Sequence, residues 1–127
     1  MKSTRVIPVT RHMPEWDRIE ASVQVLNSGG IVAFPTDTVY GLAASIYSAE
    51  AIERLSQLKE RPLGHGFVVL IADPSWLNEL VRALEPRLKQ LVKDYWPGPL
   101  TIVFKASDRV PQGVRAADGT IALRMPN

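Results

Sequence analysis

The hydrophobic and polar positions of this chain follow two different periods, and each period predicts a different kind of element. Trp16, Ile19, Val23 and Leu26 are spaced by three or four residues, which places their side chains on one face of a helix. Similar spacings, together with caps and proline stops, predict further helices. The predicted helices cover residues 14–28, the stretch from Ser48 to Pro62, residues 73–80 and residues 85–95.

Short apolar runs bounded by glycine, proline or polar residues predict strands. These runs lie at residues 5–10, 31–34, 66–72, 100–104 and 120–125. Pro8 favours an edge position for the first strand, because proline cannot donate to a ladder. The run at 66–72 is apolar at almost every position, so we expect both faces of that strand to be covered. Residues 107–119 contain proline and glycine and are predicted to form a loop.

Helices alternate with strands early in the chain and two strands can pair late, which predicts the α/β class. We expect a twisted, open, mixed sheet with flanking helices, built as a single domain over residues 1–127. Ser48 is expected to cap the second helix. The buried face of that helix is predicted to contain Ala51, Ile52, Leu55 and Leu58. The helix at 85–95 is predicted to bury Leu84, Leu88, Leu91, Val92 and Tyr95.

Composition narrows the class of protein without identifying it. Hydrophobic residues make up 46% and charged residues 22% of the chain, as in ordinary globular proteins. The absence of cysteine excludes disulfides, thiolate metal sites and a thiol nucleophile, and it is compatible with a cytoplasmic location. No apolar run reaches the length of a transmembrane helix, so we expect no membrane association.

Charge and histidine content set limits on ligands. The net charge of +2 permits contact with a nucleotide or RNA but is far below that of a dedicated nucleic-acid arm. His12 and His65 are far apart and lack any ligand spacing, so we predict no metal site built from protein ligands.

Polar side chains crowd the exit of the strand predicted at residues 31–34. Thr36, Asp37, Thr38 and Tyr40 follow it closely. This composition suits the rim of a pocket better than a core, and ligands of open α/β sheets lie outside the carboxyl ends of strands. The alternative is that the threonines only cap a turn after the strand.

Two cations, Lys59 and Arg61, stand at the end of the second predicted helix, before a loop in which His65 lies between two glycines. Residues two apart do not share a helix face, so the chain must leave the helix here if both cations serve one ligand, and Pro62 provides that exit. Such a pair suits an anion such as a nucleotide. The alternatives are solvated cations near the helix dipole and a surface histidine.

Arg124 interrupts the apolar alternation of the strand predicted at 120–125. An apolar residue would cost less on a core face, so an arginine at this position needs an anion or water. Thr120 lies on the same face of that strand, because side chains alternate with a period of two.

Four motifs resemble the YrdC-type threonylcarbamoyl-AMP synthases. They are PTDTVYGL at residues 35–42, KERP at residues 59–62, WPGPLT at residues 96–101 and ALRMP at residues 122–126. The motifs occur in the order of the family and at similar spacings, and the resemblance runs from about residue 23 to residue 127. The family has a further stretch with a Ser-x-Asn motif that helps to close the nucleotide site, and this sequence does not contain it.

The resemblance implies a twisted open α/β sheet and an enzyme that converts L-threonine, bicarbonate and ATP into threonylcarbamoyl-AMP and pyrophosphate. The product serves the threonylcarbamoyladenosine modification of tRNA in the cytoplasm, with partner proteins of that pathway. The resemblance also implies that Thr36, Thr38, Tyr40 and Arg124 bind threonine.

The remaining cations and Thr120 are implied to serve the nucleotide. The family implies nucleotide contacts for Lys59, Arg61, His65 and Thr120. Lys59 and Arg61 would have the catalytic role, because they offset phosphate charge as it develops. Magnesium would arrive with ATP and be held largely by phosphate and water.

The turn at residues 96–99 is also part of the resemblance, and the alternative for it is a rigid structural role that packs Trp96.

Three alternatives remain open. The first is a noncatalytic module that binds tRNA or double-stranded RNA, although the scattered lysines and arginines give it little support. The second is a carbamoyl-adenylate domain of hydrogenase maturation, which normally belongs to a chain much longer than 127 residues. The third is an inactive, C-terminally truncated chain of the same family. It would leave an apolar sheet face or an unpaired edge near residues 120–125 and would self-associate.

Overall fold

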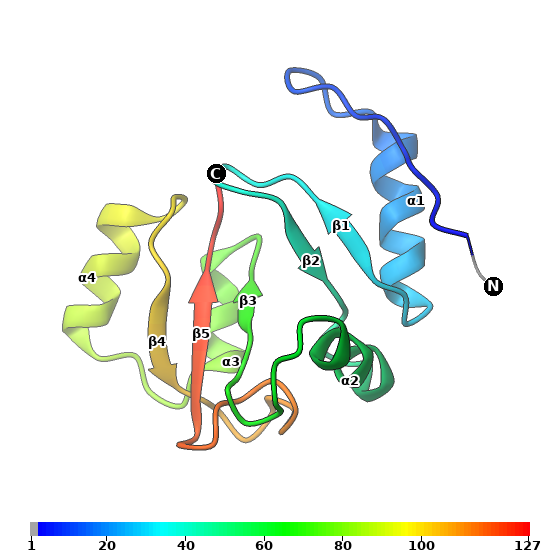
Figure 1. The fold of residues 1–127 in the computed structure, drawn as a ribbon. Coiled ribbons are helices and arrows are strands. Elements are labelled where there is room, and N and C mark those ends of the chain that lie inside the picture. Colours follow the sequence, from blue (N-terminus) through cyan, green and yellow to red (C-terminus); the bar gives the residue numbers. More distant parts are fainter. Residues whose placement is uncertain (1–2) are drawn as a thin grey trace.

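The computed structural model describes residues 3–127 and shows a mixed α/β fold, which confirms the predicted class (Figure 1). The helices are α1 (Trp16–Asn27), α2 (Ala49–Leu58), α3 (Leu77–Leu80) and α4 (Pro86–Tyr95), and a short 3-10 turn, η1 (Pro74–Trp76), leads into α3. The strands are β1 (Val32–Phe34), β2 (Gly41–Ala43), β3 (Val68–Leu70), β4 (Ile102–Lys105) and β5 (Thr120–Arg124). No helix within residues 3–127 has both the length and the apolar character needed to span a membrane.

The strands form two small sheets (Figure 1). β1 and β2 form an antiparallel pair in which Val32 lies opposite Ala43. β3, β5 and β4 form a three-stranded sheet in that order. β5 is parallel to β3 and antiparallel to β4, so this sheet is mixed, as the sequence predicts.

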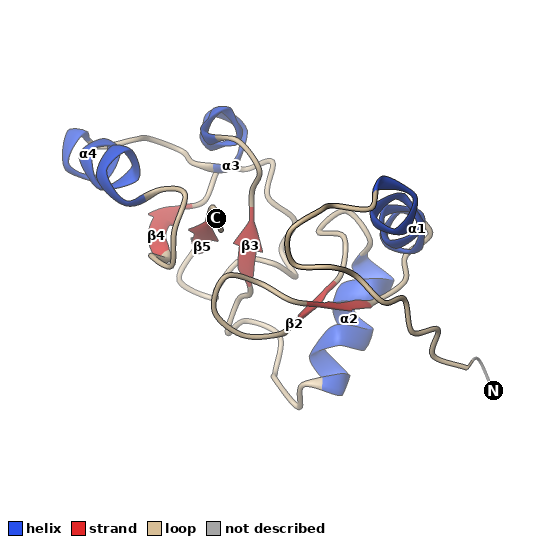
Figure 2. Ribbon diagram, turned by 90° about the horizontal axis from the view of Figure 1, so that it is seen from above, coloured by secondary structure: helices blue, strands red, loops and turns tan. Residues whose placement is uncertain are grey.

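One face of the three-stranded sheet forms the main core. Side chains alternate along each strand, so every second residue of β5 points to the same side. Figure 2 shows α3 and α4 on one side of this sheet, where they cover its apolar residues. The core contains Val69, Ile102, Phe104, Ile121 and Leu123 from the strands and Leu77, Leu80 and Val92 from the helices.

The opposite face of the sheet is open. It carries Thr120, Ala122 and Arg124 of β5, with Val68 and Val103 on either side of Ala122. Val68 is 53% exposed and Val103 is 56% exposed. The polar residues of β5, Thr120 and Arg124, lie on this open face.

Helix α2 begins as predicted and ends earlier than its apolar pattern suggests. The side chain of Ser48 accepts a hydrogen bond from the backbone N–H of Ala51 at 3.3 Å, which confirms the cap. Ala51, Ile52 and Leu55 are buried, as expected. The expectation for Leu58 is wrong, because this residue is 64% exposed at the last position of the helix, where the chain turns away from the core.

The expected apolar face of α1 does not enter the core. Trp16 is 74% exposed and Val23 is 44% exposed, and α1 has no buried residue. Figure 1 shows α1 at the outer side of the fold, beside β1. The strand predicted at residues 5–10 is also wrong. That segment runs beside α1 without a strand partner, and the Arg18 side chain donates to the carbonyl oxygen of Pro8.

Two expectations about the strands need correction, and one strand of the structure has no counterpart among the predicted strands. β2 was not predicted, because its short sequence follows the polar residues of the 35–40 loop. β3 is covered on one face only: Val69 is buried, whereas Val68 and Leu70 are exposed, because α3 and α4 lie on a single side of the sheet. Of the apolar sheet face or unpaired edge expected near residues 120–125, the edge is wrong because β5 is the central strand, whereas Val68 and Val103 do leave apolar side chains exposed beside Ala122.

The α4 prediction is confirmed only in part. Val92 is buried and Leu88 packs against the core. The other residues assigned to this face are exposed, and these are Leu84, Leu91 and Tyr95. Because α4 is a short helix at the rim of the sheet, only a narrow stripe of it meets the core.

Candidate functional site

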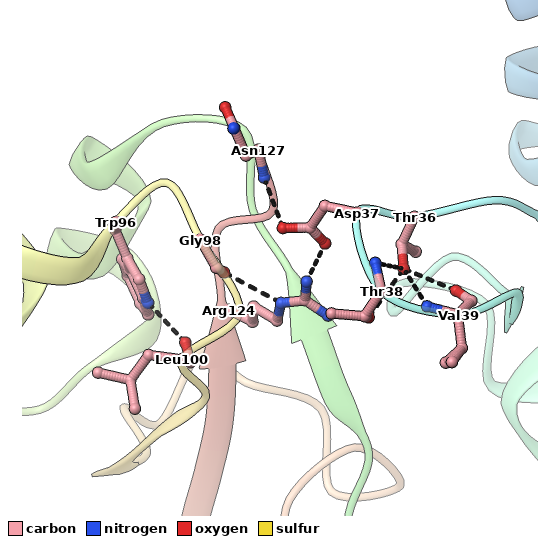
Figure 3. Close-up of polar contacts among 9 residues, drawn as sticks. All are labelled: Thr36, Asp37, Thr38, Val39, Trp96, Gly98, Leu100, Arg124 and Asn127. Atoms are coloured by element: carbon pink, nitrogen blue, oxygen red, sulfur yellow. Dashed lines mark hydrogen bonds and ion pairs between the residues drawn. The ribbon is translucent and has the colours of Figure 1, made fainter. Parts of the chain in front are cut away.

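Arg124, at the carboxyl end of β5, connects segments that are distant in the sequence (Figure 3). Its Nε donates to the carbonyl oxygen of Gly98 at 3.1 Å, and its Nη1 donates to Oγ1 of Thr38 at 3.2 Å. Its Nη2 forms an ion pair with the carboxylate of Asp37. Only 11% of the Arg124 side chain is exposed. The arginine that was predicted to need an anion therefore has one within its own chain.

Asp37 is held from two directions (Figure 3). Its Oδ1 pairs with Arg124, and its Oδ2 accepts a hydrogen bond from the backbone N–H of Asn127 at 3.1 Å. The Asn127 hydrogen bond, followed by the hydrogen bond and charge of Arg124, holds the pKa of Asp37 below its ordinary value of 3.8, against the opposing effect of burial. Asp37 is therefore ionised at neutral pH.

The loop that carries Asp37 is shaped by Thr36. Oγ1 of Thr36 donates to the carbonyl oxygen of Val39 at 2.6 Å and accepts the N–H groups of Thr38 and Val39, each at 3.2 Å. Thr36 thus closes a turn, in agreement with the alternative that the threonines of this loop cap a turn after the strand. Thr38 also faces Arg124, so the two threonines differ in what they contact. Tyr40 is 78% exposed and points away from the core.

The turn that contains Trp96 and Gly98 fixes the third contact of Arg124. Trp96 is buried at 8% exposure, as the structural alternative for this turn supposed. The N–H of Gly98 donates to the carbonyl oxygen of Met125 at 2.8 Å, on the strand side of the turn. A Cβ atom at Gly98 would lie 2.6 Å from the backbone oxygen of Tyr95, so only glycine fits without a shift of the turn. The turn therefore packs Trp96 into the core and positions the carbonyl oxygen of Gly98 beside Arg124.

A second cluster lies toward the other end of the open face of β5. Arg61, His65 and Thr120 line a pocket of about 140 Å³, together with apolar residues of β3, β4 and β5. Nε of Arg61 donates to the carbonyl oxygen of Gly66 at 3.0 Å, and its Nη2 donates to that of His65 at 3.2 Å. The Arg61 guanidinium also lies 6.0 Å from the ring centre of Phe67. Three of the four residues that were assigned to a nucleotide thus come together.

Lys59 does not line this pocket. It is the C-cap residue of α2, and the positive φ of Glu60, 48°, turns the chain before Arg61. The chain does leave the helix near the two cations, but the expected exit at Pro62 is wrong, because α2 ends at Leu58 and the chain turns at Glu60. The hydroxyl of Thr120 donates to Oδ1 of Asp118 at 2.6 Å, which fixes its orientation at the edge of the pocket.

The two clusters share one strand. Thr120 and Arg124 are four residues apart on the open face of β5, which separates their Cα atoms by roughly 13 Å. The sequence places Asp37 at the expected pocket rim but assigns it no partner, although a carboxylate between two threonines and an arginine in need of an anion are both visible in it. The backbone groups of Gly98 and Asn127 carry no side-chain signal. Residues 3–127 contain no group of three or more histidine, aspartate or glutamate side chains that could hold a metal ion.

Stability as a function of pH should report the ion pair of Asp37. Because folding lowers the pKa of Asp37, its carboxylate stabilises the fold above the unfolded pKa, and this contribution is lost as the pH falls through the folded pKa. We expect the difference in Tm between the parent chain and Asp37→Asn to be largest near neutral pH and to disappear below the ordinary carboxylate range. Scanning calorimetry across this range measures it, and a difference that persists at the lowest pH would contradict the assignment.

Comparison with known sequences identifies relatives across most of the chain. The sequence model of the Sua5, YciO and YrdC family, described as telomere recombination, matches residues 24–127. The threonylcarbamoyl-AMP synthase of Pyrococcus abyssi is 36% identical over 97% of this chain, and that of Bacillus subtilis is 35% identical over 100% of it. The chain spans only 36% and 38% of the lengths of these two relatives.

Solved structures give the same result for the fold. Sua5 of Pyrococcus abyssi complexed with L-threonine is 36% identical and superimposes with a TM-score of 0.90, over 97% of this chain and 36% of that chain. YciO of E. coli is 28% identical, with a TM-score of 0.82 over 91% of this chain and 56% of that chain. The described elements therefore have the arrangement found in these proteins.

Proposed function

The chain belongs to the Sua5, YciO and YrdC family, and from this premise we propose that it carries the L-threonine and ATP sites of a threonylcarbamoyl-AMP synthase. In the proposed reaction, L-threonine, bicarbonate and ATP give threonylcarbamoyl-AMP, pyrophosphate and water. The threonine amine forms a bond to the bicarbonate carbon as water leaves. An oxygen of the resulting carbamate then attacks the α-phosphorus of ATP, and the bond to pyrophosphate breaks.

The threonine end of the proposal is supported by the Arg124 cluster. The observation that carries it is the likeness to a Sua5 protein complexed with L-threonine, at 36% identity and a TM-score of 0.90. In this chain the 35–40 loop and β5 meet where the guanidinium of Arg124 donates a hydrogen bond to the hydroxyl of Thr38. A hydroxyl and a guanidinium are groups that can bind the hydroxyl and carboxylate of threonine.

The nucleotide end of the proposal is supported by the pocket of Arg61, His65 and Thr120. The guanidinium of Arg61 has five N–H donors. Two of them, one on Nε and one on Nη2, bind carbonyl oxygens of the loop, so three remain for phosphate oxygens. We propose that Lys59 reaches the same phosphates from the end of α2. Magnesium, bound to the ATP, would add positive charge there.

Catalysis in this proposal depends on binding ATP and L-threonine through residues of the same strand, β5. The roughly 13 Å between the Cα atoms of Thr120 and Arg124 is a distance that a nucleotide and an amino acid can bridge together. Alignment of the carbamate with the α-phosphorus, and neutralisation of phosphate charge, would lower the barrier without a covalent intermediate. The product would enter tRNA modification in the cytoplasm, together with proteins of that pathway.

Binding experiments test the proposal directly. Titration calorimetry should detect L-threonine binding and Mg·ATP binding to this chain, and pyrophosphate release should then be measured with bicarbonate and both substrates. Double-stranded RNA is titrated in parallel. Binding of RNA with no response to threonine or ATP would overturn the proposal in favour of the noncatalytic alternative.

The double variant Lys59→Ala with Arg61→Ala should lose ATP affinity by at least tenfold and leave L-threonine affinity unchanged. Each charge-assisted contact to phosphate contributes about 1.5–3 kcal/mol, and the threonine cluster lies at the other end of β5. The matched control is Arg87→Ala with Lys89→Ala on α4, which removes the same charge from an exposed helix remote from the pocket. Equal loss of ATP affinity in both double variants would mean that only net charge matters.

A further inference from the structure

We infer that Asp37 and Arg124 recognise a zwitterion together, with Arg124 binding the α-carboxylate of an amino acid and Asp37 binding its α-ammonium. This inference rests on the proposed function and adds Asp37 as the residue that selects an amino acid over a plain carboxylic acid. It starts from the contact that joins the two side chains at the end of β5 (Figure 3).

Arg124 keeps donors for a ligand even with all three of its protein contacts in place. A guanidinium has five N–H groups, one on Nε and two on each terminal nitrogen. Gly98, Thr38 and Asp37 each take one of them. One N–H therefore remains on each terminal nitrogen, and such a pair can bind the two oxygens of a carboxylate.

Asp37 likewise keeps acceptor capacity. An ionised carboxylate has about four lone-pair positions, and Arg124 and the backbone N–H of Asn127 use two of them. The side chain of Asp37 is 17% exposed, so solvent reaches part of it. Its pKa is lowered, which makes it a weak proton acceptor. Asp37 is thus suited to orient an ammonium group and poorly suited to deprotonate it.

The charge of the pair decides what kind of ligand it accepts. Arg124 and Asp37 together carry no net charge, and their side chains are 11% and 17% exposed. A plain carboxylate is attracted by Arg124 and repelled by Asp37, so little attraction remains. A zwitterion places its positive group next to Asp37 and its negative group next to Arg124. The two charges of an α-amino acid are joined through a single carbon, which matches two side chains in direct contact.

The test compares L-threonine with two analogues that each lack one charge. (R)-3-hydroxybutanoate keeps the carboxylate and the hydroxyl but has no ammonium, and (R)-1-amino-2-propanol has no carboxylate. Calorimetry with the parent chain should show at least tenfold tighter binding of L-threonine than of either analogue, since one charge-assisted hydrogen bond corresponds to about tenfold or more. Equal affinity of the parent chain for L-threonine and (R)-3-hydroxybutanoate would overturn the inference without the need for any variant.

Variants at Asp37 then separate recognition from simple support of Arg124. Asp37→Asn should lose L-threonine affinity by at least tenfold while its affinity for (R)-3-hydroxybutanoate stays the same or rises, because the repulsion is removed. Asp37→Glu should keep the preference for L-threonine. Asp108→Asn is the matched control, because Asp108 forms an exposed ion pair with Arg82 and should change neither affinity.

Two results with Asp37→Asn would overturn the inference. Equal loss of affinity for both ligands would make Asp37 only a support for Arg124. Tighter binding of L-threonine would make Asp37 a competitor for Arg124. A parent chain that binds no L-threonine would overturn the proposed function itself, which is a different result from either of these. Thermal unfolding of each variant identifies losses that come from misfolding.

Discussion

Replacing Arg124 by alanine is expected to weaken L-threonine binding by roughly 2–4 kcal/mol, or about 30- to 700-fold. The loss has two sources. The ligand carboxylate loses its cation, and the carboxylate of Asp37 loses its ion-pair partner. Calorimetric titration of L-threonine measures the effect. Arg124→Lys should recover only part of it, because an ammonium group cannot contact Gly98, Thr38 and Asp37 in the same planar arrangement.

The matched control for this prediction is Arg82→Ala. Arg82 also pairs with an aspartate, at 2.9 Å, but its side chain is 62% exposed and lies away from the 35–40 loop. Exposed ion pairs contribute little, so this variant should bind L-threonine as the parent chain does. Unchanged threonine affinity in Arg124→Ala, with Asp37 still ionised, would remove Arg124 from the binding site.

Replacing Phe104 by alanine is expected to lower the free energy of unfolding by about 3–5 kcal/mol. Phe104 is 1% exposed, and its ring meets that of Trp96 edge-on with centres 6.3 Å apart. The substitution would leave a cavity between the sheet and the turn that positions Gly98. Urea denaturation measures the change through the shift of the midpoint.

Val103→Ala provides the comparison on the same strand. Val103 is the neighbour of Phe104 on β4 and is 56% exposed on the open face of the sheet. Its removal should cost well under 1 kcal/mol, because little apolar contact is lost. If the two variants were destabilised equally, the assignment of one buried and one open face to this sheet would be wrong.

The sequence predicted the position of Arg124 better than it predicted its partner. An arginine in an apolar alternation indicates that one face of the strand is not core, and the structure agrees. Asp37 lies 87 residues away, and nothing local links the two. Only the pairing of β5 with its neighbours and the course of the 35–40 loop bring them together. Long-range contacts of this kind depend on topology, which a single sequence determines only indirectly.

The predicted helices also show that local sequence determines local structure better than it determines long-range contacts. The pattern in α2 identified its cap and most of its buried face, because Ser48 and the apolar residues act locally. The pattern in α1 identified which side chains share a face but not what covers them, and Trp16 is exposed. An exit of the chain from the helix near Lys59 and Arg61 was predictable, although it comes at Glu60 and not at Pro62. The separation of Lys59 from the pocket was not, because it depends on the turn at Glu60.

The strict alternation of β5 also bears on how this protein can acquire new preferences. Ile121 and Leu123 are 1% and 0% exposed, so substitutions at these positions must preserve volume or the fold is lost. Thr120 and Ala122 lie on the other side of the strand, where a change of side chain leaves the core untouched, whereas Arg124 on that side also holds Gly98 and Asp37. Variation can therefore accumulate at Thr120 and Ala122 at less risk to stability than at Ile121 or Leu123. Under the proposed function, such exchanges would change the ligand contacts of this chain before they change its fold.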